Sequence, residues 1–251
     1  MRVNRKIAQI GVIALIALLI GVACTAAVFA YIPDSGSAPS IYDDFNYSTT
    51  GSSFWHVNAV GGDNEIKPSS LTLTGASIEL DRRIQTDPNE TVVSLRIRAQ
   101  HFEKFGFGIG VYHSGTVGIE FDGDGIKCGR GTDYGYQVDP VVVWKTPHVN
   151  QWFYLRLVVK NPYPDPAVLA KLGNIDPAKL KKVTVICSAW DNQGHLVGQV
   201  TPTDPPPNAH YAAFDEVFMR TWNSNNRYQI DWFYAGPPDG DPLHYIVHAR
   251  P

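Results

Sequence analysis

Three carboxylates lie close together in the segment from Glu120 to Asp124, at positions 120, 122 and 124. Alternate residues of a β-strand point to one face, so the spacing predicts that the three side chains share a face. Crowded carboxylates have pKa values that are pushed apart, as a retaining glycoside hydrolase requires of its acid and its nucleophile. One hypothesis therefore assigns catalysis to Glu120, Asp122 and Asp124.

Two other interpretations of this segment remain open. No cofactor is expected from the sequence, and the alternative is calcium at Asp122 and Asp124, which carry oxygen ligands of the kind that calcium prefers. Alternatively, Asp122-Gly123 and Asp124-Gly125 form a plain hairpin turn, with Glu120 paired across strands to Arg96 or Arg98.

A second group of candidates surrounds Trp222. An indole ring suits the apolar CH face of a sugar, while amide and guanidinium groups suit its hydroxyls. The segment after this tryptophan supplies Asn223, Asn225, Asn226 and Arg227. Further aromatic residues near turns are expected on the same surface: Tyr112, Tyr134 and Trp144. The alternative is an ordinary surface loop in which Trp222 covers the core.

The elements that position these residues are β-strands. Between Thr91 and Val143 apolar and polar residues alternate, as in Phe105, Phe107 and Ile109 set between glycines. A period of two predicts half-buried antiparallel strands with one face on a core. The sequence therefore predicts an all-β fold, a two-sheet antiparallel jelly-roll sandwich.

Composition excludes several classes of function. The net charge is -3 and charged residues make up 18% of the chain, so there is no basic stripe for nucleic acid. The histidines lack metal-ligand spacing. No Gly-x-Ser-x-Gly elbow or phosphate-binding glycine loop is present.

The N-terminus predicts export. Arg2, Arg5 and Lys6 precede an apolar run that extends to residue 32, long enough for a membrane-spanning helix. The basic residues should stay in the cytosol, which places the rest outside as a single-pass membrane protein. Cleavage after Ala30, giving a secreted protein, and lipidation at Cys24 are the alternatives.

Export makes a disulfide between Cys128 and Cys187 a possibility, since both belong to the globular part and an oxidising compartment favours pairing. The alternative is two small buried hydrophobic residues on separate strands.

The chain divides into four predicted parts. Residues 1–32 are the anchor or signal helix, and 33–40 a flexible linker. Residues 41–237 are the jelly-roll domain, with a helical-turn insertion at 161–182, where two Asp-Pro pairs have the form of helix starts. Residues 238–251 are a tail. Strands are expected over 71–74 and 77–84, separated from the preceding strand by a turn at Gly61-Gly62-Asp63-Asn64.

Four motifs resemble the concanavalin A-like lectin/glucanase superfamily, which includes laminin-G-like jelly rolls. Val183 to Gly198, with its Asp-Asn-Gln-Gly turn, is similar to the back-sheet hairpin of this superfamily. Asp43-Asp44-Phe45 followed by Trp55 is similar to its opening strand. Phe105 to Gly131 is similar to its concave-sheet hairpins, and Asp231-Trp232-Phe233-Tyr234 to its closing strand. The resemblance implies a jelly roll. Together with the group around Trp222, it leads us to expect a domain that binds a polysaccharide or glycan without catalysis. A glycoside hydrolase and a structural or adhesion module of the cell envelope are the alternatives. In laminarinase-like members of the superfamily, whose signature the segment 120–124 resembles, Glu120 would be the nucleophile, Asp122 its helper and Asp124 the acid.

Overall fold

The protein is described by a computed structural model, which describes residues 40–46, 55–67, 70–84, 89–110, 116–123, 125–132, 135–136, 141–160, 184–202, 216–222 and 226–248. All of these belong to one unit within residues 37–251. The elements are β1 (Ile41–Asp43), β2 (His56–Lys67), β3 (Ser70–Arg83), β4 (Glu90–Ala99), β5 (Glu103–Ile109), β6 (Thr116–Asp122), β7 (Ile126–Thr132), β8 (Gly135–Tyr136), β9 (Val141–Trp144), β10 (Phe153–Lys160), β11 (Thr184–Trp190), β12 (Leu196–Val200), β13 (Glu216–Trp222), β14 (Arg227–Gly236), η2 (Pro238–Gly240) and α3 (Pro242–His248).

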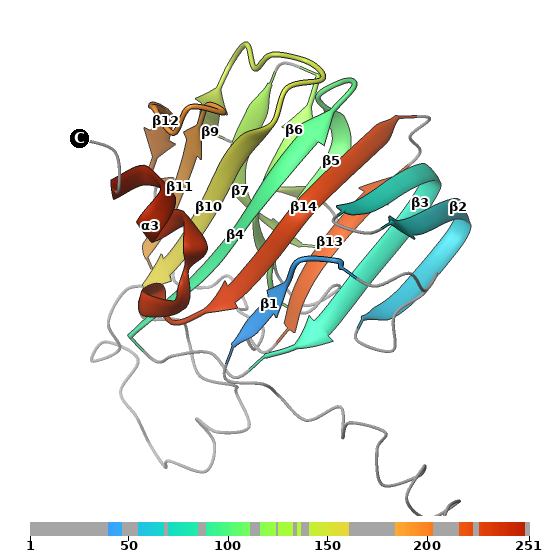
Figure 1. The fold of residues 1–251 in the computed structure, drawn as a ribbon, viewed down its shortest axis with the longest axis horizontal. Coiled ribbons are helices and arrows are strands. Elements are labelled where there is room, and N and C mark those ends of the chain that lie inside the picture. The colour runs from blue at the N-terminus through green and yellow to red at the C-terminus, as the bar shows by residue number, and fades with distance from the viewer. Residues whose placement is uncertain are drawn as a thin grey trace, which may run out of the picture. The chain divides into compact units, whose positions relative to one another are not determined.

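The strands form two antiparallel layers (Figure 1). We call layer A the strands β12-β11-β10-β4-β14, with β1 paired to β14. Layer B is β13-β5-β6-β7, with β8 and β9 both paired to β7. The expected all-β sandwich of two antiparallel sheets is confirmed.

One long strand passes from layer A into layer B. The first part of β3 pairs with β14, from Leu71 to Thr74, and the second part pairs with β13 from Ser77 onward. The expected break between two strands is therefore wrong. The expected turn at 61–64 is also wrong, because these residues lie within β2, where Gly62 pairs with Gly75. A glycine pair lets the hairpin bend between layers without ending, because glycine has no Cβ to obstruct the bend.

Alternating side chains from both layers fill the space between them. In β5, Phe105, Phe107 and Ile109 are fully buried, as the period of two predicts. Phe105 packs against Phe121 of β6 and Tyr228 of β14, with ring centroids 5.0 Å apart in each case. Each such buried side chain contributes about 1.5–3 kcal/mol, so this core is the main source of stability.

The opening and closing motifs of the domain meet in space. Asp43 pairs with Phe233 across β1 and β14, and its nearly buried carboxylate accepts a 2.7 Å hydrogen bond from Nε1 of Trp55. The Trp55 ring in turn packs edge-on against Phe233 at 5.1 Å. Residues from opposite ends of the domain sequence thus close the fold, because a buried carboxylate needs a donor and Trp55 supplies it.

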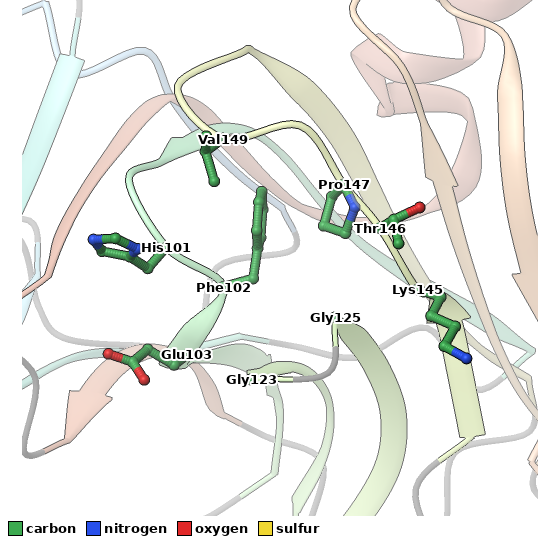
Figure 2. A pocket seen from close by; sticks show the side chains of 9 residues that line it. All are labelled: His101, Phe102, Glu103, Gly123, Gly125, Lys145, Thr146, Pro147 and Val149. Atoms are coloured by element: carbon green, nitrogen blue, oxygen red, sulfur yellow. The ribbon is translucent and has the colours of Figure 1, made fainter.

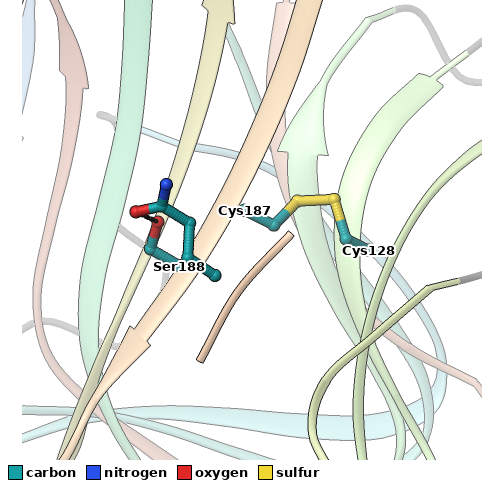
Figure 3. The surroundings of a disulfide bond; sticks show 4 residues. Cys128, Cys187 and Ser188 are labelled. Carbon is teal, nitrogen blue, oxygen red and sulfur yellow. Dashed lines mark hydrogen bonds between the residues drawn. A yellow bond between two sulfur atoms is a disulfide. The ribbon is translucent and has the colours of Figure 1, made fainter. Parts of the chain in front are cut away.

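The opposite edges of the two layers are joined by a disulfide. Cys128 of β7 and Cys187 of β11 are fully buried and bonded to each other (Figure 3). Close by, β12 approaches β9 so tightly that a Cβ on Gly198 would lie 1.8 Å from the Val143 carbonyl oxygen. The sandwich is therefore held along one edge by β3 and along the other by a covalent bond.

The residues after Pro237 were expected to form a tail, and this boundary is corrected. Of these, Pro238–Gly240 form η2 and Pro242–His248 form α3, which lie across the outer face of layer A (Figure 1). Leu243 is fully buried in a second apolar cluster that includes Trp190, Trp232 and Tyr234. Burial, with help from the carboxylates of Asp241 and Asp239, raises the pKa of Tyr234 to about 12. Layer A carries aromatic side chains on its outer face, and the segment covers them because exposing them costs free energy.

Two predicted segments lie outside the described residues: the N-terminal membrane or signal helix with its linker, and the insertion at 161–182. Within the described part of the chain, no helix is long and apolar enough to cross a bilayer.

Candidate functional site at the loop end of layer B

The strands of layer B bring three separate segments to one end of the sandwich. A single row of paired residues crosses the layer there: Thr221, Phe105, Phe121, Ile126 and Trp144. Just beyond this row lie residues 100–104, 122–123, 125 and 145–150, and we call this region the loop end of layer B. The predicted acidic segment and Trp222, about 100 residues apart in sequence, therefore share one end of one layer.

A cavity of about 520 Å³ opens at the loop end and is called the groove below. Three segments line it, supplying His101, Phe102, Glu103, Gly123, Gly125, Lys145, Thr146, Pro147 and Val149. Figure 2 shows the Phe102 ring between Pro147 on one side and His101 and Glu103 on the other. The groove thus combines an apolar ring with polar side chains around it.

The segment between β6 and β7 forms a tight turn at the floor of the groove. Gly123 and Gly125 have φ angles of +47° and +126°, which favour glycine over other residues. The Asp122 amide donates a 3.1 Å hydrogen bond to the Gly125 carbonyl. A Cβ on Gly125 would lie 2.3 Å from the Trp144 carbonyl oxygen, so the turn rests directly on the end of β9. Asp122-Gly123 therefore begins a turn, as one of the open interpretations expected.

The Asn226 side chain holds the segment 101–103 in place through hydrogen bonds to its backbone. The Asn226 side chain is nearly buried, donates to the His101 carbonyl at 2.7 Å and accepts from the His101 amide at 3.2 Å. The side-chain amide of Asn226 is therefore hydrogen-bonded within the protein. Phe102 packs between Phe121 and Phe153 at 5.4 and 5.6 Å, which fixes its ring at the base of the groove.

The polar side chains of the groove are available to a ligand. His101, Glu103, Lys145 and Thr146 are exposed, and within the described part of the chain their side chains make no ion pair or hydrogen bond. In contrast, Glu120 and Asp122 of β6, on the adjoining outer face of layer B, are each paired with a cation. The groove thus offers hydrogen-bonding groups that the described part of the chain does not use.

The predicted catalytic carboxylates show this pairing. Glu120 lies 3.3 Å from Arg220, and both side chains are largely buried. Asp122 is exposed and lies 2.7 Å from Nζ of Lys127. Asp124 lies outside the described residues. Within the described residues, Glu120 therefore pairs with Arg220 of β13.

The arginines expected as partners of Glu120 are on the other layer. Arg96 pairs with Asp231 at 2.8 Å, and Arg98 donates to Gln229. Both guanidinium groups lie about 5 Å from the ring of Trp152. The expected pairing of Glu120 with Arg96 or Arg98 is wrong, because strand alternation alone does not tell which strands are neighbours.

The predicted group around Trp222 is divided by the fold. Trp222 is half-buried on the outer face of layer B, where its ring lies over Gly106 and 5.4 Å from the Arg220 guanidinium. Arg227 belongs to β14 and alternates with buried Tyr228, so it lies on the outer face of layer A. Asn226 holds His101, and Asn223 and Asn225 lie outside the described residues.

Of the remaining aromatic candidates, the structure describes Trp144, which does not add to this surface. Trp144 packs against the core, with its ring edge-on to Phe153 at 5.7 Å. Tyr112 and Tyr134 lie outside the described residues. Trp144 therefore supports the groove through its backbone, beneath the β6–β7 turn.

No group of three or more His, Cys, Asp or Glu side chains in the described segments is arranged to hold a metal ion. The calcium site at Asp122 and Asp124 stays a prediction.

Sequence reasoning missed His101, Phe102, Glu103 and Lys145. Each lies at or just beyond the end of a strand, in a segment with no motif of its own. These residues come together only because three loops meet at one end of layer B. That meeting depends on the order of the strands, so no local pattern in the sequence indicates it.

We expect Glu120→Gln to lower the free energy of unfolding by about 1 kcal/mol, because it removes one partner of a partly buried ion pair. A urea titration of the variant beside Asp122→Asn measures this, since the exposed Asp122 pair should contribute little. The glycoside hydrolase hypothesis would be favoured instead by two results together: the unfolding midpoint of Glu120→Gln is unchanged, and the wild type hydrolyses β-glucan while the variant does not.

No family model matches this chain, and a comparison with curated proteins finds no match either. Among solved structures, a sialidase aligns with a TM-score of 0.52 and 13% identity over 82% of this chain, which corresponds to 19% of the sialidase chain. A protein of unknown function from Shewanella oneidensis MR-1 aligns at 0.49 with 11% identity, covering 84% of this chain and 91% of that one. The exoplasmic/lumenal domain of VIP36 in its Ca²⁺/Man3GlcNAc-bound form aligns at 0.45 with 6% identity, covering 80% and 92%. The expected concanavalin A-like jelly roll is confirmed at the level of the fold.

Proposed function

We propose that this domain binds carbohydrate, without catalysis, in the groove at the loop end of layer B. The observation that carries the proposal is the groove itself, an open cavity of about 520 Å³ with an aromatic base and unpaired polar side chains around it. Sugars present apolar CH faces beside hydroxyl groups, and they pair with this combination of surfaces.

Each polar group has a definable role in this proposal. Glu103 accepts hydrogen bonds from sugar hydroxyls, and Lys145 donates to sugar oxygens. His101 and Thr146 both donate and accept, as alternating hydroxyls require. Because the groove is open and its contacts are few and hydrated, affinity for a single sugar is weak and repeated units strengthen it.

Trp222 remains a second candidate surface for the same ligand. It lies at the same end of layer B and is half-buried, so part of its ring is accessible. A polysaccharide long enough to leave the groove would meet the outer face of layer B, where an indole offers stacking.

The location of the domain is part of the proposal. The basic head of residues 2–6 and the apolar run to residue 32 support an exported domain at the outer side of the cell membrane. The disulfide between Cys128 and Cys187 supports an oxidising compartment. An external location is also where a cell-surface or environmental polysaccharide is met.

We expect the purified full chain to bind oligosaccharides on a glycan array, and the double variant His101→Ala/Glu103→Ala to bind at least about tenfold more weakly. The reason is that two direct hydrogen-bonding groups are lost, at roughly 1 kcal/mol each. Affinity is then measured by calorimetry with the strongest array glycan, and melting temperature is followed in parallel.

His195→Ala is the matched control, since this exposed histidine lies in the β11–β12 turn of layer A. It should bind like the wild type. Trp222→Ala separates the two surfaces: if it abolishes binding and the double variant does not, the site is the outer face of layer B. A wild type that binds no glycan would overturn the proposed function.

A further inference from the structure

Residues 101–103 form one wall of the groove, which we call the wall. Two buried polar side chains hold it from inside the domain. Asn226 has an exposed fraction of 3% and Tyr228 of 0%. Nδ2 of Asn226 donates to the His101 carbonyl at 2.7 Å and to the Tyr228 hydroxyl at 3.1 Å. Oδ1 accepts from the His101 amide at 3.2 Å. We call Asn226 and Tyr228 the clamp.

The clamp grips both ends of the 101–103 segment. The Tyr228 hydroxyl donates to the Glu103 carbonyl, while Asn226 holds both backbone groups of His101. The Tyr228 ring is fixed between Phe105 and Phe121, with centroids 5.0 and 6.2 Å away. The position of Glu103 is therefore tied to the core rather than to the surface.

The wall needs such support because it departs from strand geometry. The register between β5 and β6 shifts between Glu103 and Phe105, and Lys104 has a φ of +57°. A lysine in the left-handed region costs free energy and persists only where surrounding contacts fix it. Side-chain hydrogen bonds from the clamp pair with backbone groups of His101 and Glu103 beside this irregularity.

We propose that Asn226, acting with Tyr228, is a positioning residue that sets the direction in which His101 and Glu103 face the groove. The inference rests on the proposed function, because its consequence is measured in ligand affinity. Neither clamp residue lines the groove. Asn226 therefore acts through the backbone of the wall, and the carbohydrate meets His101 and Glu103 only.

The test replaces Asn226 with aspartate, which has nearly the same shape. The new carboxylate would still accept from the His101 amide, but its second oxygen would lie against the His101 carbonyl, where the wild type has a donor. Tyr228→Phe removes the bond to Glu103 and keeps the ring. We expect both N226D and Y228F to weaken binding of the strongest array glycan at least about fivefold, since each removes a hydrogen bond of roughly 1 kcal/mol, and to speed hydrogen exchange in residues 100–104.

Leu243→Ala is the control for stability, since it empties a buried site under α3 in layer A. At a temperature where all variants are folded by near-ultraviolet circular dichroism, it should keep wild-type affinity and wild-type exchange in residues 100–104. The same melting-temperature loss in Leu243→Ala and Asn226→Asp, with affinity lost only in the latter, supports positioning.

Two outcomes contradict the inference while the proposed function stands, and a third contradicts both. If His101→Ala/Glu103→Ala loses binding while Asn226→Asp and Tyr228→Phe keep it, the groove stands and the clamp does not position it. If Leu243→Ala weakens binding as much as Asn226→Asp, the effect is general stability. If the wild type binds no glycan, the proposed function falls, and unchanged exchange in the clamp variants would overturn the clamp as well.

Discussion

Replacing both Cys128 and Cys187 with alanine will lower the free energy of unfolding by at least about 4 kcal/mol, which is the contribution of the cross-link in the chain-entropy model. The bond closes a loop with a sequence separation of 59 residues, so its loss gives the unfolded chain much more freedom. It also joins the edges of layers A and B that β3 does not connect. For a domain of this size the melting temperature should fall by roughly 8–16 °C.

Reduction of the wild type separates the cross-link from the packing of the two side chains. A urea titration with and without a thiol reductant measures the cross-link alone, because both sulfurs stay in place. The double alanine variant adds the loss of two buried side chains, and so should be the less stable of the two. If the reductant leaves the unfolding midpoint of the wild type unchanged, the two cysteines are not bonded in solution.

Asp241→Asn will lower the free energy of unfolding by about 3 kcal/mol. This is the lower end of the range for removing one partner of a buried ion pair. The Asp241 side chain is fully buried, and Oδ2 lies 2.9 Å from Nε of Arg156. The two atoms are close but not aligned as a hydrogen bond, so we take the lower figure. The other oxygen accepts from the Ser94 hydroxyl at 2.6 Å and from the Leu243 amide at 3.1 Å.

The loss arises because an asparagine leaves the Arg156 guanidinium without a counter-charge beneath α3. We expect α3 to detach from layer A, which exposes the cluster containing Trp190 and Trp232. Tryptophan fluorescence during urea unfolding therefore reports both the midpoint and the detachment.

Asp239→Asn is the matched control for this variant. Asp239 lies in η2, two residues before Asp241, but it is exposed. Its replacement should change the free energy of unfolding by less than about 0.5 kcal/mol. Equal effects of the two substitutions would show that the buried pair does not hold α3.

These two predictions also bear on the proposed function. Both changes lie away from the groove: the disulfide is at the β7–β11 edge and Asp241 is on the outer face of layer A. Variants that remain folded should therefore bind like the wild type. The clamp variants are different, because Asn226 and Tyr228 contact the groove wall directly.

Individual strands were predictable from the sequence because their information is local. Phe105, Phe107 and Ile109 alternate with glycines, and this period of two is imposed by strand geometry itself. The turn at Gly123 was predictable for a similar reason, since glycine tolerates the backbone angles that a tight turn needs. Where a local rule was ambiguous, as at Gly62 and Gly75, a bend in a continuous hairpin was mistaken for a turn.

The partners of each strand were decided only by the tertiary structure. Glu120 faces Arg220, and not Arg96 or Arg98, because β13 and β6 flank β5. Trp222 and Arg227 are close in sequence, yet they lie on opposite layers. The groove shows the same limit, since His101, Gly125 and Lys145 meet only when three strand ends are placed side by side. Alternation determines which face a side chain takes within its own strand, whereas the order of strands is set by long-range packing that no short segment encodes.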